Sequence, residues 1–177
     1  MTYKSIGKDI ETIRNQIQDN TTNPYAASTD FSHTSKYVFA FLKKPASGTP
    51  TDQELYDKAN RERTLPIIVD IELIDEGLLP MRGGKWSQMP VLIRCFCKAD
   101  TKLTFQSNRM EAEELALDKL NEIRYNFQTN NTIKAAFAAA GMYVSYDGYG
   151  SLRPIDPGNT TDFGYAMEVT FTRSTRT

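Results

Sequence analysis

Two segments rich in branched apolar residues constrain the fold more than any other feature of this chain. They are LPIIVDIELI at 65–74 and PVLIRCFCKA at 90–99. Short runs enriched in Val, Ile, Leu and Phe are typical of β-strands. The stretch between them, 75–90, contains three glycines and two prolines. We therefore predict that the two strands pair as a long β-hairpin across the connection 75–90.

The only two cysteines, Cys95 and Cys97, lie on the second of these strands. Because side chains alternate across a strand, both thiols share one face with Val91 and Ile93. A structural zinc site needs four ligands, and the only histidine, His33, is far away in a polar stretch. Free cysteine packs as a small hydrophobic residue. We therefore predict packed core thiols, with no metal and no cofactor.

Two helices are predicted from apolar residues at helical spacing. The first ends at TTNP, 21–24, and its apolar face is formed by Ile6, Ile10, Ile13 and Ile17. The second is predicted to begin with Asn108 as N-cap and Glu111 at the capping-box position. Its predicted buried face consists of Ala112, Ala116, Leu120, Ile123 and Phe127. A third, shorter helix is expected over 132–140, with Asn131 as N-cap and Gly141 as its stop.

The remaining segments complete a predicted order of α, β, β, β, α, α, β, β. Strands are expected over 37–42, 142–146 and 165–172, and flexible loops near 20–35 and 43–64. Within the latter, 51–62 reads either as a short exposed helix or as loop. The predicted fold class is α+β: a mainly antiparallel (mixed) sheet with a long β-hairpin and helices packed on one face. A length of 177 residues favours a single domain, 1–177.

The overall charge and hydropathy limit the classes of partner. The formal net charge is −1, so no general field attracts this chain to nucleic acid or to anionic lipid. No apolar stretch approaches the length of a membrane span, and we expect no membrane partner. The N-terminus lacks the apolar core of a secretory signal, and two cysteines on one strand do not make a disulfide framework. These features favour folding in a reducing cytoplasm.

The residue types of catalytic sites are sparse, and we predict that the chain is not an enzyme. No phosphate-binding loop, dinucleotide fingerprint or nucleophile elbow is present. Asp70 and Glu72 alternate on one strand, where paired carboxylates could hold Mg²⁺ or transfer protons. The alternation itself favours a face turned to solvent or to another subunit. His33, alone in a polar loop, is read as a surface residue rather than a catalytic base.

Aromatic residues gather in two regions and raise the possibility of nucleic-acid binding. Tyr143, Tyr146 and Tyr149 lie close together, and five more aromatics lie between 25 and 41. Stacking platforms for single strands combine aromatics with basic residues on the same strands. Basic neighbours are few here, which disfavours this function.

The connection 75–90 holds apolar residues that a loop normally avoids. Trp, Met and Arg are the types enriched where proteins meet. One interpretation is that the loop folds back on its own sheet. The other is that it contacts another subunit or partner through Leu78, Leu79, Met81, Arg82, Lys85 and Trp86.

The sequence resembles the tail terminator (tail-completion) proteins of the neck of tailed bacteriophages. Four features carry the resemblance: the helix IGKDIETIRNQI, the ribbon from LPIIVDIELI to MPVLIRCFCKAD, the helix RMEAEELALDKLNEIRYNF, and the closing strand AMEVTFTRSTRT. The resemblance is one of pattern over most of the chain, since the family has no catalytic motif to match. The insert 43–64 and the loop DGYGSLRPIDPGNTTDFG are longer than in the compact form of that family.

The resemblance implies a virion protein that assembles with itself into a ring, in that family a hexamer. Such a ring caps the completed tail tube, stops its polymerisation and offers a surface for joining the head. The implied partners are the tail tube protein and a head-completion or connector protein. Genomic DNA would pass through the lumen without being read. The ring would assemble in the host cytoplasm and remain in the neck of the virion.

Two other classes of function stay open on the residues alone. Another head–tail connector, adaptor or head-completion protein would show the same pattern. A stand-alone cytoplasmic α+β enzyme or nucleic-acid-binding domain would instead show a polar pocket or salt-dependent binding.

Overall fold

The computed structural model describes residues 4–23, 37–40, 67–74, 84–98, 105–155 and 162–175, with the backbone alone described at 98, 105–110 and 162. The predicted loops near 20–35 and 43–64 lie outside these residues, apart from 20–23. The same holds for the alternative readings of 51–62.

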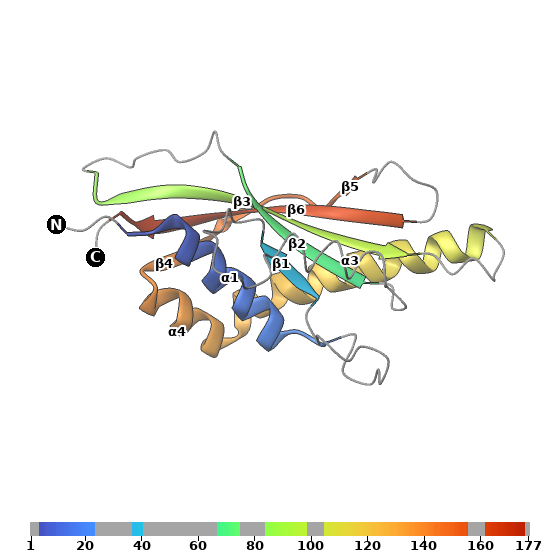
Figure 1. Ribbon diagram of the computed structural model, residues 1–177, viewed down its shortest axis with the longest axis horizontal. Coiled ribbons are helices and arrows are strands. Elements are labelled where there is room, and N and C mark those ends of the chain that lie inside the picture. Colours follow the sequence, from blue (N-terminus) through green and yellow to red (C-terminus); the bar gives the residue numbers. More distant parts are fainter. Residues whose placement is uncertain are drawn as a thin grey trace, which may run out of the picture.

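A sheet of six strands forms one layer of the molecule (Figure 1). Its order is β1 (Val38–Ala40), β2 (Ile67–Leu73), β3 (Trp86–Lys98), β6 (Asp162–Ser174) and β4 (Met142–Tyr149), while β5 (Arg153–Ile155) also pairs with β6. Among these strands, β1 and β2 pair in parallel and the remaining pairs are antiparallel. The predicted α+β class with a mixed, mainly antiparallel sheet is therefore confirmed.

The longest ladder joins β3 to β6, which are neighbours in the sheet but far apart in sequence. It runs from Trp86 opposite Ser174 to Lys98 opposite Asp162, and 13 residues per strand extend over roughly 40 Å. The predicted β2–β3 hairpin is present, with Ile67 opposite Cys97 and Leu73 opposite Val91. The predicted connection 75–90 is too long, however, because pairing with β6 extends β3 back to Trp86. The sequence does not indicate this extension of β3, because Ser87 and Gln88 are polar.

The helices of the described residues lie on one face of the sheet (Figure 1): α1 (Ile6–Asn20), α3 (Phe105–Thr129) and α4 (Asn131–Ala139). Ser5 caps α1 by accepting a hydrogen bond from the Lys8 N–H at 3.4 Å. The predicted N-cap of the second helix is wrong, because α3 begins at Phe105 and Asn108 lies inside it. The regular apolar stripe begins only at Ala112, so helical spacing gives no signal for the first residues of α3.

The boundaries of α4 differ from the prediction by one residue. Asn130, rather than Asn131, is the N-cap, and its side chain accepts hydrogen bonds from the N–H groups of Thr132 at 2.9 Å and Ile133 at 3.4 Å. Gly141 ends the helix as predicted. Its φ of 62° is the left-handed conformation that glycine adopts without a steric penalty.

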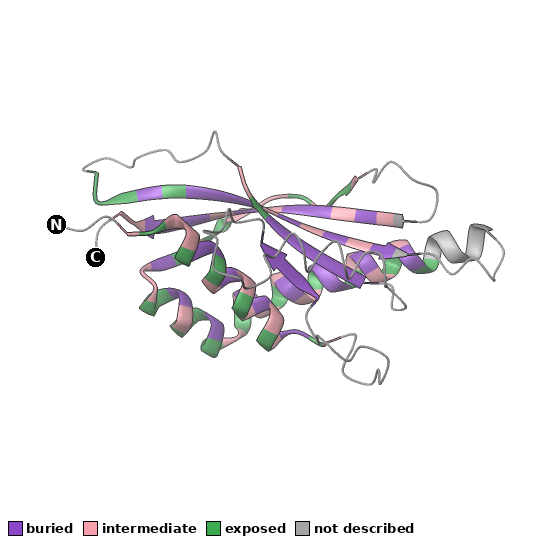
Figure 2. Cartoon of the chain, in the orientation of Figure 1, coloured by how far each residue is buried: buried purple, intermediate pink, exposed green. Residues whose placement is uncertain are grey.

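The core lies between the helices and the sheet, where both present buried residues (Figure 2). Both predicted helix faces are confirmed: Ile10, Ile13 and Ile17 of α1 are buried, as is the full predicted stripe of α3. Phe127, Phe137 and Phe171 form a triangle of edge-to-face contacts with ring centroids 5.1, 5.3 and 6.0 Å apart. This geometry is favourable for aromatic rings and joins α3, α4 and β6 in one core.

Candidate interaction surface

The predicted interface residues divide into two groups. Leu78, Leu79, Met81 and Arg82 lie outside the described residues. Lys85 is exposed in the bend before β3, and Trp86 is the first residue of β3. The placement of Trp86 in a loop is therefore wrong, but its side chain is still 41% exposed.

Trp86 contacts an aromatic residue that sequence reasoning had not linked to it. The rings of Trp86 and Tyr143 meet edge to face at 6.0 Å, which is a favourable separation. Tyr143 is 50% exposed, and Tyr146, three residues further along β4, is 92% exposed. We call these three exposed aromatics of β3 and β4 the aromatic surface; Trp86 and Tyr143 are in contact, and Tyr146 lies on the same strand as Tyr143. Ser87 and Met89 point into the core, so alternation places Trp86 on the sheet face opposite the helices.

β4 is the last strand in the sheet order, so one of its edges faces away from β6. Among the described strands, β6 is the one that pairs with β4. Their register shifts between Val144 and Tyr149, which leaves 145–148 in a bulge. Gly148 packs so tightly there that an added Cβ would lie 2.8 Å from the Thr170 carbonyl oxygen. A bulge commonly interrupts an exposed edge, and this one carries Tyr146 outward.

The carboxylates Asp70 and Glu72 lie beside Arg94 of the neighbouring strand. Arg94 Nε is 2.6 Å from Asp70 Oδ1, and Arg94 Nη2 is 2.9 Å from Glu72 Oε2. Glu72 is exposed as expected, but Asp70 is 2% exposed, which corrects the solvent-facing prediction. Burial raises the pKa of Asp70, although the hydrogen bond and charge of Arg94 oppose that rise. Both carboxylates therefore serve an ion-pair group.

Cys95 and Cys97 are free thiols, both buried in the core. Burial raises the pKa of Cys95 well above its ordinary value, and the neighbouring Cys97 thiol adds to the rise. A thiol kept neutral in this way is a poor nucleophile and a poor metal ligand. The prediction of packed core thiols is confirmed. In the described part of the chain, no group of three or more His, Cys, Asp or Glu side chains is arranged to hold a metal ion.

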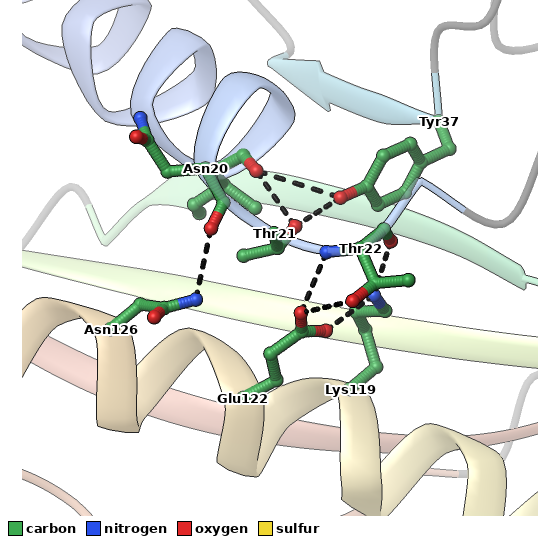
Figure 3. Close-up of polar contacts among 8 residues, drawn as sticks. Asn20, Thr21, Thr22, Tyr37, Lys119, Glu122 and Asn126 are labelled. Atoms are coloured by element: carbon green, nitrogen blue, oxygen red, sulfur yellow. Dashed lines mark hydrogen bonds and ion pairs between the residues drawn. The ribbon is translucent and has the colours of Figure 1, made fainter. Parts of the chain in front are cut away.

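A partly buried polar network joins the end of α1 to α3 and β1 (Figure 3). Lys119 Nζ donates at 2.6 Å to the Thr22 carbonyl oxygen and at 2.6 Å to Glu122 Oε2. Glu122 Oε1 accepts from the Thr22 N–H at 2.6 Å and from its hydroxyl at 2.8 Å. Asn126 Nδ2 donates to the Asn20 carbonyl oxygen at 3.0 Å. These bonds satisfy the Asn20 carbonyl at the end of α1 and the Thr22 carbonyl just beyond it, and they fix the direction of α1 against α3.

Tyr37 closes the network on the side of β1. Its hydroxyl is hydrogen-bonded to the Thr21 hydroxyl, and the Lys119 ammonium lies 5.4 Å from its ring centroid. Burial raises the pKa of Tyr37 to about 12, against the lowering effect of the Thr21 bond. The phenol is therefore neutral near pH 7 and does not act as a base. No local pattern in the sequence indicates this network, because Lys119 and Thr22 are 97 residues apart in the chain.

A second buried ionic group lies at the opposite end of α1. Asp9, 1% exposed, is 2.6 Å from Arg173 Nε and 2.5 Å from Lys4 Nζ. Arg173 Nη2 also donates to the Lys4 carbonyl oxygen at 2.9 Å. This group ties the start of α1 to the end of β6. The sequence does not predict this ionic group, because Asp9 and Arg173 are far apart in the chain.

Among the described residues, several of the aromatic side chains singled out above are not available for stacking bases. Tyr37 and Phe39 are buried, and the ring of Tyr149 is covered by the Arg124 guanidinium at 5.6 Å. Burial raises the pKa of Tyr149 to about 12, although the Arg124 charge opposes it. His33 lies outside the described residues. The aromatics that the structure describes as exposed are those of the aromatic surface and Tyr125 on α3.

No family model matches the chain, and no curated protein sequence matches it significantly. None of the described helices combines the length and apolar character needed to cross a bilayer.

Proposed function

We propose that this protein is a structural component of the neck of a tailed bacteriophage, a tail terminator. Copies of the chain close into a ring, for which a hexamer is the expected state. The ring caps the tail tube, stops its polymerisation and presents a surface to the head-completion or connector protein. The protein is then part of the virion. The proposal rests on the resemblance in the pattern of elements and on the geometry of the aromatic surface.

The observation that carries this proposal is the aromatic surface beside the outer edge of β4. Trp and Tyr are the residues that contribute most to binding when they are buried between proteins. An exposed sheet edge next to them offers unpaired backbone groups to a neighbour. A closed ring requires head-to-tail contacts between two different patches of the same chain. The aromatic surface supplies one such patch.

The charge of the chain is compatible with a channel for DNA. A net charge of −1 gives no strong attraction to the phosphate backbone, so DNA can slide through a ring without being held. The proposed role needs no catalytic group. It agrees with the way in which Lys119, Glu122, Asp9 and Arg173 are paired with one another rather than turned toward an open site.

The first experiment measures the solution mass by light scattering, with negative-stain images of the same peak. We expect closed rings with an open channel. Tyr146→Ala is the most informative variant. Because the Tyr146 side chain is 92% exposed, its removal should change the stability of the monomer by no more than about 0.5 kcal/mol. Loss of an aromatic contact at the interface costs about 2 kcal/mol or more, roughly thirtyfold in affinity at each contact. We therefore expect smaller species from this variant.

Tyr125→Ala is the matched control. Tyr125 is 65% exposed, but it lies on α3, in the helical layer, rather than on a strand. If both variants still form rings to the same extent, the aromatic surface is not part of the interface between subunits. A wild-type monomer that also fails to limit the length of tail tubes polymerised in its presence would contradict the terminator role. Binding to a head connector without any effect on tube length would instead indicate another neck component.

A further inference from the structure

Both ends of the described chain meet at one place, which we call the end junction. The Lys4 N–H donates to the Thr175 carbonyl oxygen at 3.2 Å, and the Thr175 N–H donates to the Lys85 carbonyl oxygen at 3.0 Å. The Thr175 hydroxyl donates to the Gly84 carbonyl oxygen at 2.8 Å, and the Ser174 N–H donates to the Gly141 carbonyl oxygen at 2.8 Å. The junction thus joins the starts of α1, β3 and β4 to the end of β6.

The Asp9 group lies directly beside this junction. Arg173 immediately precedes Ser174 and Thr175, and its guanidinium contacts both the Asp9 carboxylate and the Lys4 carbonyl oxygen. Lys4 contributes an ammonium group to Asp9 and backbone groups to Thr175 and Arg173. One buried carboxylate therefore holds the two cations whose backbones form the junction. Without Asp9, two positive charges would be left facing each other in a largely buried place.

The junction also sets the positions of two aromatic residues of the candidate interface. Trp86 follows Lys85 and pairs with Ser174. Tyr143 comes two residues after Gly141 and pairs with Thr172. The edge-to-face contact between Trp86 and Tyr143 therefore depends on strands whose first residues are held by junction bonds. The helix side and the aromatic side of the sheet are connected through the same residues of β6.

We propose that Asp9 is a positioning residue for the aromatic surface. Docking of the N-terminal segment through Asp9, Arg173 and Lys4 holds β3 and β4 so that Trp86 and Tyr143 are correctly placed for assembly. Displacement of that segment releases the starts of both strands and lowers the capacity to assemble. The inference rests on the proposed function only in its last step, because the coupling between Asp9 and Trp86 is a property of the single chain.

The test uses Asp9→Asn in the full chain, with Trp86 as a probe, since it is the only tryptophan. We expect greater quenching of Trp86 fluorescence by acrylamide. We also expect amide hydrogen exchange at 84–86, 141–143 and 173–175 to become about a hundredfold faster, because an unpaired buried cation destabilises its surroundings locally. Glu122→Gln is the matched control. It weakens an ionic group of similar size at the other end of α1 and is expected to leave Trp86 quenching and these amides unchanged.

A folded Asp9→Asn protein with wild-type Trp86 quenching and wild-type exchange at the junction would overturn the proposal. If Asp9→Asn does not fold, Lys4→Met decides the question, because it keeps the Asp9–Arg173 pair and removes one cation. A change in Trp86 quenching in the same direction, but smaller, supports the proposal, and no change overturns it. If Tyr146→Ala and Trp86→Ala leave the solution mass unchanged, the proposed ring interface fails, whereas the coupling measured by fluorescence still stands.

Discussion

Burial of a charged side chain is tolerated when protein groups replace the water that it loses. Lys119, 6% exposed, has a carbonyl oxygen, a carboxylate and an aromatic face around its ammonium. Asp9 has two cations. Removal of a single partner from such a group typically costs about 3–5 kcal/mol, because the other charge remains buried and unpaired. These two groups are therefore the positions at which single charge substitutions should be most damaging.

Glu122 gives a prediction for the dependence of stability on pH. Burial alone would raise its pKa, but hydrogen bonds from Lys119 and Thr22 outweigh that effect and lower it. A carboxyl group with a lowered folded pKa stabilises the protein above its unfolded pKa, and this contribution is lost as pH falls through the folded value. We expect the free energy of unfolding of the wild type to fall below about pH 4.5. The curve of Glu122→Gln should be flatter in that range, as measured by urea denaturation. Parallel curves would show that Glu122 is not part of a stabilising network.

The cysteines give a second prediction at the scale of the residue. Because both thiols are buried and burial raises the pKa of Cys95, we expect neither to react with an aromatic disulfide reagent in the folded protein near pH 8. Both should react promptly in denaturant. Rapid labelling of the folded protein would mean that β3 is not packed as described.

At the scale of the element, two described glycines with positive φ allow the cost of backbone strain to be separated from the cost of a steric contact. Gly141 (φ 62°) and Gly84 (φ 65°) have nearly the same backbone conformation. A Cβ on Gly141 would lie 3.3 Å from Ser174 Cβ, whereas a Cβ on Gly84 would meet nothing within 4 Å. We expect Gly84→Ala to cost about 1 kcal/mol from backbone strain alone. Gly141→Ala should cost more, because a contact is added, and thermal unfolding of both variants measures the difference. Equal losses would show that the α4–β4 turn adjusts freely.

Elements with strong apolar periodicity were predictable from the sequence, whereas the starts of several of them were not. The faces of α1 and α3 follow from Ile10, Ile13, Leu120 and Ile123 because helical spacing directly specifies which side packs. The start of β3 at Trp86 was not predictable, since Ser87 and Gln88 join the strand by pairing with β6 rather than by their own preference. The pairing of β3 with β6 is a long-range choice that no local pattern encodes.

The candidate site shows the same division. Trp86 was predicted as an interface residue because of its residue type. Its exposure could also be predicted, because it is an apolar residue in a polar segment. Its contact with Tyr143 could not, because it depends on the register of β4 against β6. The groups around Asp9 and Lys119 were equally hidden, since their members are 164 and about 100 residues apart in the chain.

For the molecule as a whole, the sheet order predicts which backbone amides exchange most slowly with solvent. β3 and β6 are central, are paired over their full length, and carry a face covered by α3. β4 and β5 pair with β6 alone and over short stretches. We therefore expect the slowest amide exchange in the middle of β3 and β6, and faster exchange in β4 and β5. Uniform protection across the sheet would instead indicate that all of these strands open together.

The meeting of the two chain ends has a practical consequence for anyone who labels this protein. The first and last described residues, Lys4 and Thr175, are hydrogen-bonded to each other, and Thr175 is also bonded to Lys85, next to Trp86. An affinity tag or a fluorescent fusion at either terminus would be attached beside the same surface. Moving the tag from one end to the other would therefore not relieve steric interference, and assembly should be studied after the tag has been cleaved.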